Sequence, residues 1–214
     1  MRKQLLLSLI FVGLASASFG QKLAFNLRSP SAFGIEFTRG NEKNFLFDDL
    51  DYFYRTHTLK FQFYYPFLQW RKLELSLVIQ PQIQLVQHQL YNEQFVRPNE
   101  TNYLLKRATY TKLKNLSIAA IEFTIDAKKN IFNNTAIFAQ IGLGFAFIDT
   151  PTERLARGFT FIEHFNMGVE YSITNKTSLR LFSGVGHVSN LNFKQPNSGY
   201  NIFNTGVSVW YSLH

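Results

Sequence analysis

The sequence contains no cysteine in its 214 residues. This absence excludes a disulfide-stapled fold, a thiolate zinc site, an iron–sulfur cluster and a cysteine nucleophile. The five histidines are not spaced like metal ligands, and there is neither a glycine-rich phosphate loop nor a zincin pattern. We therefore expect the protein to use no metal and no cofactor.

Long apolar runs are also scarce. After the N-terminus no stretch approaches the roughly 20 apolar residues that a membrane-spanning helix needs, which excludes helical transporters and channels. Charged residues make up only 17% of the chain and aromatic residues 16%, so the chain is not disordered. The net charge of +8 suits an anionic membrane surface as well as nucleic acid. We expect a membrane partner and no nucleic acid.

Residues 1–20 have the order of a secretory signal peptide. Arg2 and Lys3 precede the apolar run from Leu5 to Leu14, and small residues follow up to Gly20. The run is too short for a single N-terminal anchor helix, which is the alternative. We predict an exported protein with a cleaved signal peptide over 1–20 and one domain over 21–214.

Beyond residue 21 the apolar residues recur with a period of two, which indicates β-strands. Between 135 and 148, for example, Ile141, Leu143 and Phe145 alternate with Gly142 and Gly144. Eight such segments are predicted, at about 33–38, 59–65, 73–85, 115–126, 135–148, 158–172, 178–190 and 201–212. Eight strands can close into a soluble barrel or into a transmembrane one.

Three features favour the transmembrane barrel. Most segments are long, the less apolar face carries glycine and polar residues, and long connections alternate with short ones. We predict an all-β, eight-stranded antiparallel transmembrane barrel in the outer membrane of a Gram-negative bacterium. Pro81 inside the third segment is expected only at a bulge or a strand end. The residues expected outside are Phe145, Phe147, Phe159 and Phe161; those expected inside are Gln140, Gly142 and Gly144.

The end of the seventh segment carries the one group of residues suited to chemistry. His187 and Ser189 are two apart on a strand, so both side chains leave the same face, together with the apolar Val185. A serine nucleophile needs a base within hydrogen-bond reach, and this spacing can supply one. Polar groups on a lipid-facing surface are costly unless they serve a purpose, although a strand end in the headgroup region tolerates them. Catalysis and an ordinary polar strand end both remain open.

The following residues add a resemblance. His187-Val188-Ser189-Asn190, followed by Lys194-Gln195-Pro196-Asn197-Ser198-Gly199, resembles the lipid A 3-O-deacylases of the PagL type, with the same internal spacing. The resemblance implies an outer-membrane serine esterase that removes an ester-linked acyl chain from lipid A of lipopolysaccharide. It implies Ser189 as nucleophile, His187 as base, and Asn190, Asn197 and Gly199 around the oxyanion.

The third member of the triad departs from the family. Well-known members have a glutamate two residues after the motif glycine, where this chain has Asn201. Asn201 can orient His187, as asparagine does in papain-like enzymes, or the site is inactive, or another acid has replaced the glutamate. If the sixth and seventh strands pair around residue 175, Glu163 lies opposite His187. We predict that Glu163, rather than Asn201 alone, supports His187, with its carboxylate touching the imidazole. Asn201 should lie opposite or near Ser189, because we expect the external loop to turn around residues 195–196.

The expected partner is lipid A of lipopolysaccharide in the outer leaflet. Basic residues of the long loops are candidates for contacts with its phosphates: Arg97, Lys106, Arg107, Lys112, Lys114 and Lys194. The sequence leaves open a homodimer. The alternative from another class is a non-catalytic small barrel with a structural or binding role.

Overall fold

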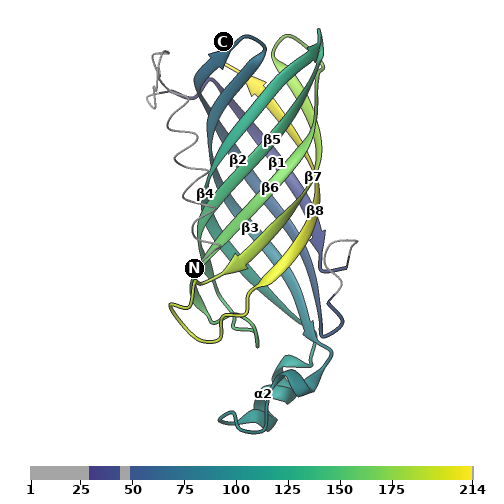
Figure 1. Cartoon of the computed structure of the whole chain (residues 1–214), viewed down its shortest axis with the longest axis vertical. Helices are drawn as coiled ribbons and strands as arrows, with labels where there is room; N and C mark the ends of the chain where they lie inside the picture. The colour runs from purple at the N-terminus through teal and green to yellow at the C-terminus, as the bar shows by residue number, and fades with distance from the viewer. Residues whose placement is uncertain (1–28, 44–48, 214) are drawn as a thin grey trace, which may run out of the picture.

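The computed structural model describes residues 29–43 and 49–213, which form a closed barrel of eight antiparallel strands (Figure 1). Each strand pairs with its sequence neighbours, and β1 pairs with β8. The strands are β1 (Ala32–Asn41), β2 (Tyr52–Trp70), β3 (Leu73–Leu90), β4 (Lys114–Phe132), β5 (Thr135–Ile148), β6 (Gly158–Ser172), β7 (Thr177–Ser189) and β8 (Tyr200–Ser212). The predicted fold is confirmed. The predicted signal peptide lies outside the described residues and stays a prediction.

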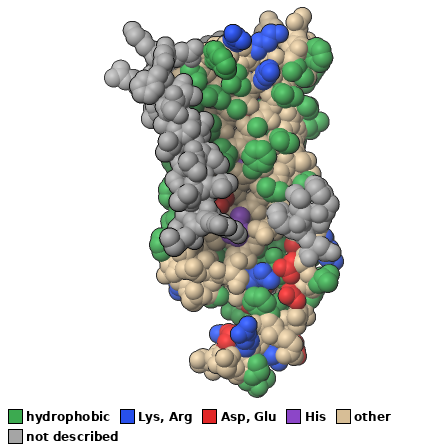
Figure 2. Space-filling view, viewed as in Figure 1, with side chains coloured by type: hydrophobic (Ala, Val, Ile, Leu, Met, Phe, Trp, Pro, Cys, Tyr) green, Lys and Arg blue, Asp and Glu red, His purple; other side chains and the backbone are tan. Residues whose placement is uncertain are grey.

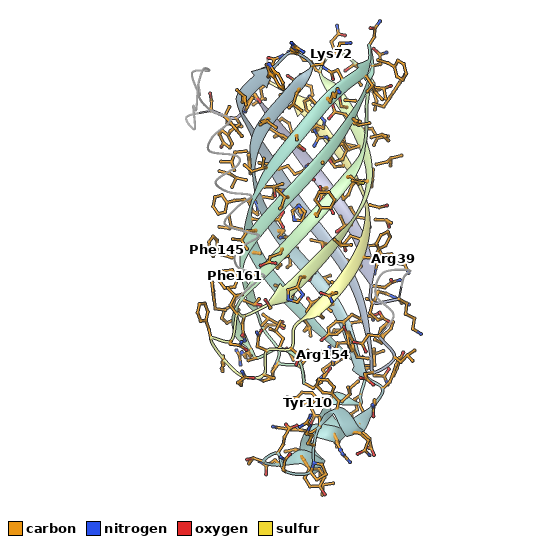
Figure 3. The ribbon with its side chains drawn as sticks, viewed as in Figure 1. Arg39, Lys72, Tyr110, Phe145, Arg154 and Phe161 are labelled. Carbon is orange, nitrogen blue, oxygen red and sulfur yellow. The ribbon has the colours of Figure 1, made fainter. Side chains whose placement is uncertain are left out.

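The strands turn apolar side chains outward and polar ones inward. Phe145 and Phe147 are about half exposed, at 49% and 54%, whereas Gln140 on the same strand is 2% exposed. Hydrophobic side chains spread over the visible wall of the barrel (Figure 2). Phe161 also faces outward (Figure 3) but is 9% exposed, because Phe159 packs against it with the ring centroids 4.9 Å apart. A polar interior inside an apolar wall is the arrangement that lipid requires.

Two polar clusters fill the lumen. Glu122 accepts hydrogen bonds from Lys60 at 3.0 Å and from Gln80 at 2.9 Å, and its other oxygen lies 3.0 Å from His164 Nδ1. Gly142 leaves room for that imidazole, because a Cβ there would overlap the His164 ring. In the low dielectric of a narrow lumen such ion pairs are strong. A charge that loses its partner there becomes costly.

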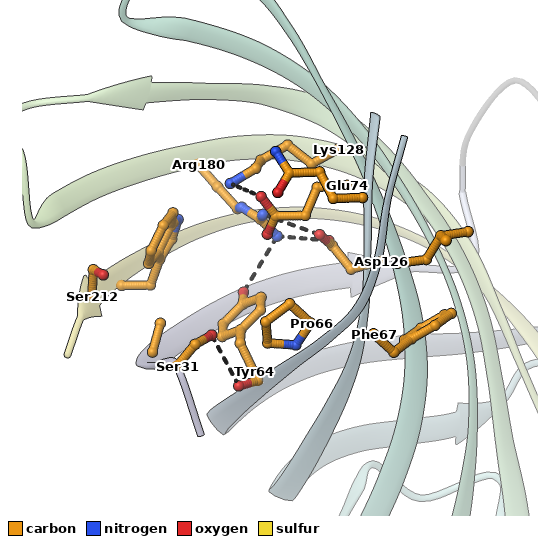
Figure 4. Close-up of a pocket in the computed structure, with 13 residues that line it drawn as sticks. Ser31, Tyr64, Pro66, Phe67, Glu74, Asp126, Lys128, Arg180 and Ser212 are labelled. Carbon is orange, nitrogen blue, oxygen red and sulfur yellow. Dashed lines mark hydrogen bonds and ion pairs between the residues drawn. The ribbon is translucent and has the colours of Figure 1, made fainter. Parts of the chain in front are cut away.

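The second cluster lies at the end of the lumen that opens into a cavity of about 700 Å³ (Figure 4). The Arg180 guanidinium donates to both oxygens of Asp126, at 2.7 and 3.2 Å, and to Glu170 at 2.7 Å. Arg180 and both carboxylates are buried. Lys128 adds an ion pair to Glu170 at 3.6 Å. These contacts pair the charged side chains at this end of the lumen with one another.

Replacing Arg180 by methionine is expected to lower the free energy of unfolding by about 3–5 kcal/mol, because the buried Asp126 loses its cation and the buried Glu170 keeps only the ion pair with Lys128. Denaturant titration of the protein refolded in detergent micelles measures this loss. The control is Arg71→Met, which removes an exposed cation from a turn and should change stability by no more than about 0.5 kcal/mol. Equal effects of the two substitutions would contradict the assignment.

The connections differ between the two ends of the barrel. Short turns at 71–72, 133–134 and 173–176 lie at one end, and the long connections lie at the other. The long connections are 42–51, 91–113, 149–157 and 190–199. In outer-membrane barrels short turns face the periplasm and long loops face outside, so the long loops define the external end. The predicted alternation is confirmed, although β2 runs to Trp70, beyond the predicted segment at about 59–65.

The longest external loop holds a 3₁₀ turn (η1, Glu93–Phe95) and a helix (α2, Tyr103–Tyr110) that the sequence pattern did not predict. The helix stands clear of the barrel (Figure 1). In the described part of the chain, no helix is both long and apolar enough to cross a membrane.

The expectation for Pro81 is wrong. It lies in the middle of β3 opposite Ile121, in unbroken register with β4. The bulge of this region lies instead at Pro66/Leu68 in β2. Losing one ladder hydrogen bond at a proline costs less than a one-residue slip, which would turn all later side chains to the wrong face.

Candidate active site

The strand register gathers three predicted site residues into one row. Glu163 of β6 lies opposite His187 of β7, which in turn lies opposite Asn201 of β8. The predicted pairing of Glu163 with His187 is confirmed. Asn201 lies opposite His187, and so near Ser189 but not opposite it, because the β7–β8 register is centred on residue 194 and not on the expected residues 195–196. All three side chains leave the outer face of the barrel.

The His187 ring is held from one side. Its Nδ1 lies 2.6 Å from Oδ1 of Asn201. A carbonyl oxygen can only accept a hydrogen bond, so this contact needs a proton on Nδ1. The other ring nitrogen, Nε2, then carries the lone pair and can serve as a base.

Glu163 does not take part in this contact. Its side chain is exposed, and among the described residues it forms no ion pair with His187. Our expectation that the Glu163 carboxylate contacts the imidazole is therefore wrong. Both residues oppose His187 directly, but the Nδ1 edge of the ring is turned toward β8.

Ser189 is the last residue of β7 and is only 7% exposed. It lies opposite Phe161, and its carbonyl oxygen accepts a hydrogen bond from Thr160 Oγ1 at 2.9 Å. Phe193, from the loop that follows, packs its ring 6.1 Å from the ring of Phe161. Within the described structure no hydrogen bond joins the Ser189 hydroxyl to His187. The serine lies at the edge of an aromatic cluster on the lipid-facing wall.

Gly199 shows where the free edge of the imidazole points. A Cβ added to Gly199 would lie 3.0 Å from Cε1 and 3.2 Å from Nε2 of His187. The β7–β8 pairing ends at Val188 opposite Tyr200, so Gly199 is at the level of Ser189, one step further along. Gly199 also has a φ of +64°, which favours glycine. The Nε2 edge therefore faces the end of the strand that carries the serine.

The loop 190–199 uses most of the donors that we expected around an oxyanion. Asn190 is fully buried; its backbone N–H donates to Asn197 Oδ1 at 2.6 Å and its side-chain amide donates to the Lys194 carbonyl at 2.7 Å. The N–H of Gly199 donates to the carbonyl of Arg154 at 3.1 Å. Among the described residues, the Asn197 amide nitrogen donates only to Asn192, at 3.3 Å, and an amide has two protons to give. Asn197 thus keeps a free donor.

Arg154 is a residue that sequence reasoning missed. Its carbonyl oxygen accepts hydrogen bonds from the N–H groups of Ser198 and Gly199, at 2.8 and 3.1 Å. Its guanidinium pairs with Asp49 at 3.1 Å and lies 3.9 Å from the ring centroid of Tyr52 (Figure 3). Arg154 therefore links three external loops: 42–51, 149–157 and 190–199. An isolated arginine in a loop carries no sequence signal of such a role.

The family model described as "Lipid A 3-O-deacylase (PagL)" matches residues 58–210, more than two thirds of the chain. The chain belongs to the PagL family of lipid A 3-O-deacylases. It is therefore assigned to the outer membrane and to a family that acts on lipid A. No curated protein sequence matches it.

Solved structures share the architecture at low identity. The structure titled "Crystal structure of the outer membrane enzyme PagL" has a TM-score of 0.51 and 12% identity, covering 82% of this chain and 97% of that one. Neisserial surface protein A (NspA) has a TM-score of 0.46 and 10% identity, covering 85% of this chain and 96% of its own. At such identities the PagL structure supports the barrel fold alone.

Several basic loop residues that were candidates for contacts with lipid A phosphates have partners within the external loops. Lys106 pairs with Glu100 at 3.0 Å and lowers the pKa of that carboxyl group. Arg107 donates to the Val96 carbonyl at 3.0 Å. Lys194 donates to the Arg157 carbonyl at 3.3 Å. These contacts shape the external loops of this PagL-family barrel.

Proposed function

We propose that the protein is an outer-membrane serine esterase that removes one ester-linked acyl chain from lipid A. One observation carries the proposal: the His187 ring is tied to Asn201 through Nδ1 and turns its Nε2 edge toward the level of Ser189. This arrangement lies on the outer wall at the external end of a PagL-family barrel, where an acyl ester of the outer leaflet would meet it.

In the first step Ser189 Oγ attacks the acyl carbonyl carbon while Nε2 of His187 takes the hydroxyl proton. The negative charge that develops on the carbonyl oxygen accepts a hydrogen bond from the side-chain amide of Asn197. Collapse of this intermediate breaks the bond to the sugar oxygen, which receives the proton from His187. A water molecule, activated in turn by His187, then hydrolyses the acyl-serine and releases a fatty acid.

Asn201 acts as the positioning residue for this base. Its carbonyl oxygen selects the ring form with a proton on Nδ1 and keeps the imidazole facing the serine. Because an amide is neutral, it stabilises the imidazolium less than a carboxylate would. Asn190 and Gly199 shape the loop, and Glu163 stands beside the site without holding the ring.

The apolar surroundings of Ser189 suit an acyl substrate. Phe159, Phe161 and Phe193 form a connected aromatic group beside the serine. An acyl chain packed there removes water from the reacting ester, which strengthens the hydrogen bonds of the charged intermediate. The proposal needs one copy of the chain and no metal or cofactor.

The purified protein, refolded in detergent micelles and mixed with lipid A, tests this function. We expect release of one fatty acid per lipid A molecule, measured by chromatography of the free acids. The non-catalytic barrel is the competing function, and it predicts no release above that of empty micelles. Folding is verified in each sample by β-sheet circular dichroism.

A further inference from the structure

Two arginines stand on the lipid-facing wall near the active site. Arg39 of β1 and Arg55 of β2 both belong to the outward-facing positions of their strands, and Arg39 is exposed. Arg39 lies opposite His57, and Asn41 lies opposite Arg55. The two arginines are therefore diagonal neighbours on one face, with Cβ atoms about 7–8 Å apart.

Neither guanidinium is neutralised in the described part of the chain. No acidic side chain there pairs with either of them, and Arg55 lies over the Phe53 ring at 5.3 Å. A cation on the outward face of a membrane strand is unfavourable unless it reaches the headgroup region or an anion. Two neighbouring cations repel each other as well, so an anion between them would relieve both costs.

The pair lies beside the catalytic strand. The strand order runs from β7 through β8 to β1 and β2, which places Arg39 two strands and Arg55 three strands from His187. At about 4.8 Å per strand, the lateral separations are about 10 and 14 Å. Arg39 is level with Ser183 and Arg55 with Val185, so offsets of about 13 and 7 Å along the strands bring both distances from His187 to about 16 Å. Arg39 projects from the outer wall in the half of the barrel nearer to α2 (Figure 3).

A groove connects Arg39 with the catalytic strand. It has a volume of about 620 Å³ and is hollow because small side chains, among them Ser183 and Thr205, line its floor between Phe37 and Met167. Ser183 lies opposite Thr205, and Thr205 lies opposite Arg39. Most of the lining residues are apolar or glycine, and Arg39 is the one charged residue among them. An apolar lining with one cation suits an acyl chain attached to an anionic headgroup.

We propose that Arg39 and Arg55 bind a phosphate group of the lipid A substrate, and that the groove takes one of its acyl chains. A guanidinium offers two parallel N–H donors to a phosphate, and two guanidinium groups on one face can hold the same anion. This subsite rests on the proposed deacylase function. It fixes the headgroup beside β1 and β2 and so presents the scissile ester to Ser189 from the side of Asn201.

The test compares the wild type with the double variant Arg39→Gln/Arg55→Gln on two substrates: phosphorylated lipid A and the same lipid A after enzymatic removal of its phosphates. The double variant is expected to raise KM for the phosphorylated substrate about tenfold or more, with kcat within twofold. On the dephosphorylated substrate, wild type and variant should have the same KM. The control Arg71→Gln removes an arginine that lies 5.5 Å over Trp70 at the opposite end, and should match the wild type throughout.

The outcomes separate the two proposals. A wild type without activity on either substrate refutes the deacylase function. An active wild type whose KM is unchanged by the double substitution refutes the phosphate subsite alone. An equal rise of KM on both substrates also refutes it, because the effect of the arginines on substrate binding then does not depend on phosphate. Binding of both lipids to Ser189→Ala, with and without the arginine substitutions, checks that the change in KM reflects affinity.

Discussion

Alanine at position 189 is expected to lower kcat for lipid A deacylation by at least about 10³-fold, because the attacking oxygen is lost. His187→Ala should cost a similar factor, since the serine then has no base. The two effects should not add, because the residues act as one unit, and the double variant should be no worse than either single one. Release of fatty acid from lipid A in micelles measures all three rates.

Both substitutions remove little packing, so the barrels should unfold at the same denaturant concentration as the wild type. Thr177→Val is the matched control, because it removes a hydroxyl from the same face of the same strand, at the end far from His187. It should keep full catalytic rate. Full activity of Ser189→Ala with a folded barrel would end the nucleophile assignment, whatever the fold.

The second large effect concerns Asn201. Asn201→Asp keeps the size of the side chain and the acceptor for Nδ1 but adds a negative charge beside the imidazolium. We expect kcat to rise about tenfold or more, because charge now stabilises the ion that forms in the transition state. Asn201→Ala should lower kcat about 10- to 100-fold with little change in KM, since it releases the ring. Steady-state kinetics of the three proteins gives these ratios.

Glu163→Gln provides the comparison. It changes a charge at a position that also lies opposite His187 but does not contact the ring, so kcat should stay within about twofold of the wild type. A loss from Glu163→Gln that exceeds the loss from Asn201→Ala would show that the carboxylate holds the imidazole during turnover, contrary to the geometry described above.

The sequence predicted the parts of the structure that follow from strand period and short turns. Alternation of apolar and small residues placed Phe145 outside and Gln140 inside, because a period of two has only two faces. The pairing of Glu163 with His187 followed from the tight turn at 173–176, which leaves little freedom of register. Where the connection between two strands is short, the sequence spacing largely determines which residues lie opposite each other.

Across longer connections, sequence spacing no longer determines the strand register. The loop 190–199 contains ten residues, and the register around it is centred on residue 194 instead of the expected 195–196, so Asn201 lies opposite His187 and only near Ser189. Strand register also fixes Cβ positions and not side-chain rotation, so it could not show that the His187 ring turns to β8 rather than to Glu163. The helix α2 has only eight residues inside a loop, too few for a clear period.

The oxyanion residues show a further limit. Asn190 and Gly199 matched the family motif by spacing, yet their donors bind Lys194 and Arg154 within the external loops. Contacts between loops far apart in sequence leave no local pattern, so Arg154 could not be found from the chain alone. The motif located the site, whereas the structure assigned Asn197 as the donor that remains free.

Mass spectrometry of lipid A from Gram-negative cells that produce the wild type or Ser189→Ala tests the central claim most directly. The account predicts that the wild type shifts lipid A to a mass lower by one acyl chain, while cells with an equal amount of Ser189→Ala in the outer membrane keep the mass of cells without the protein. Lipid A of unchanged mass in cells with the folded wild type, or the same loss with Ser189→Ala, would contradict it.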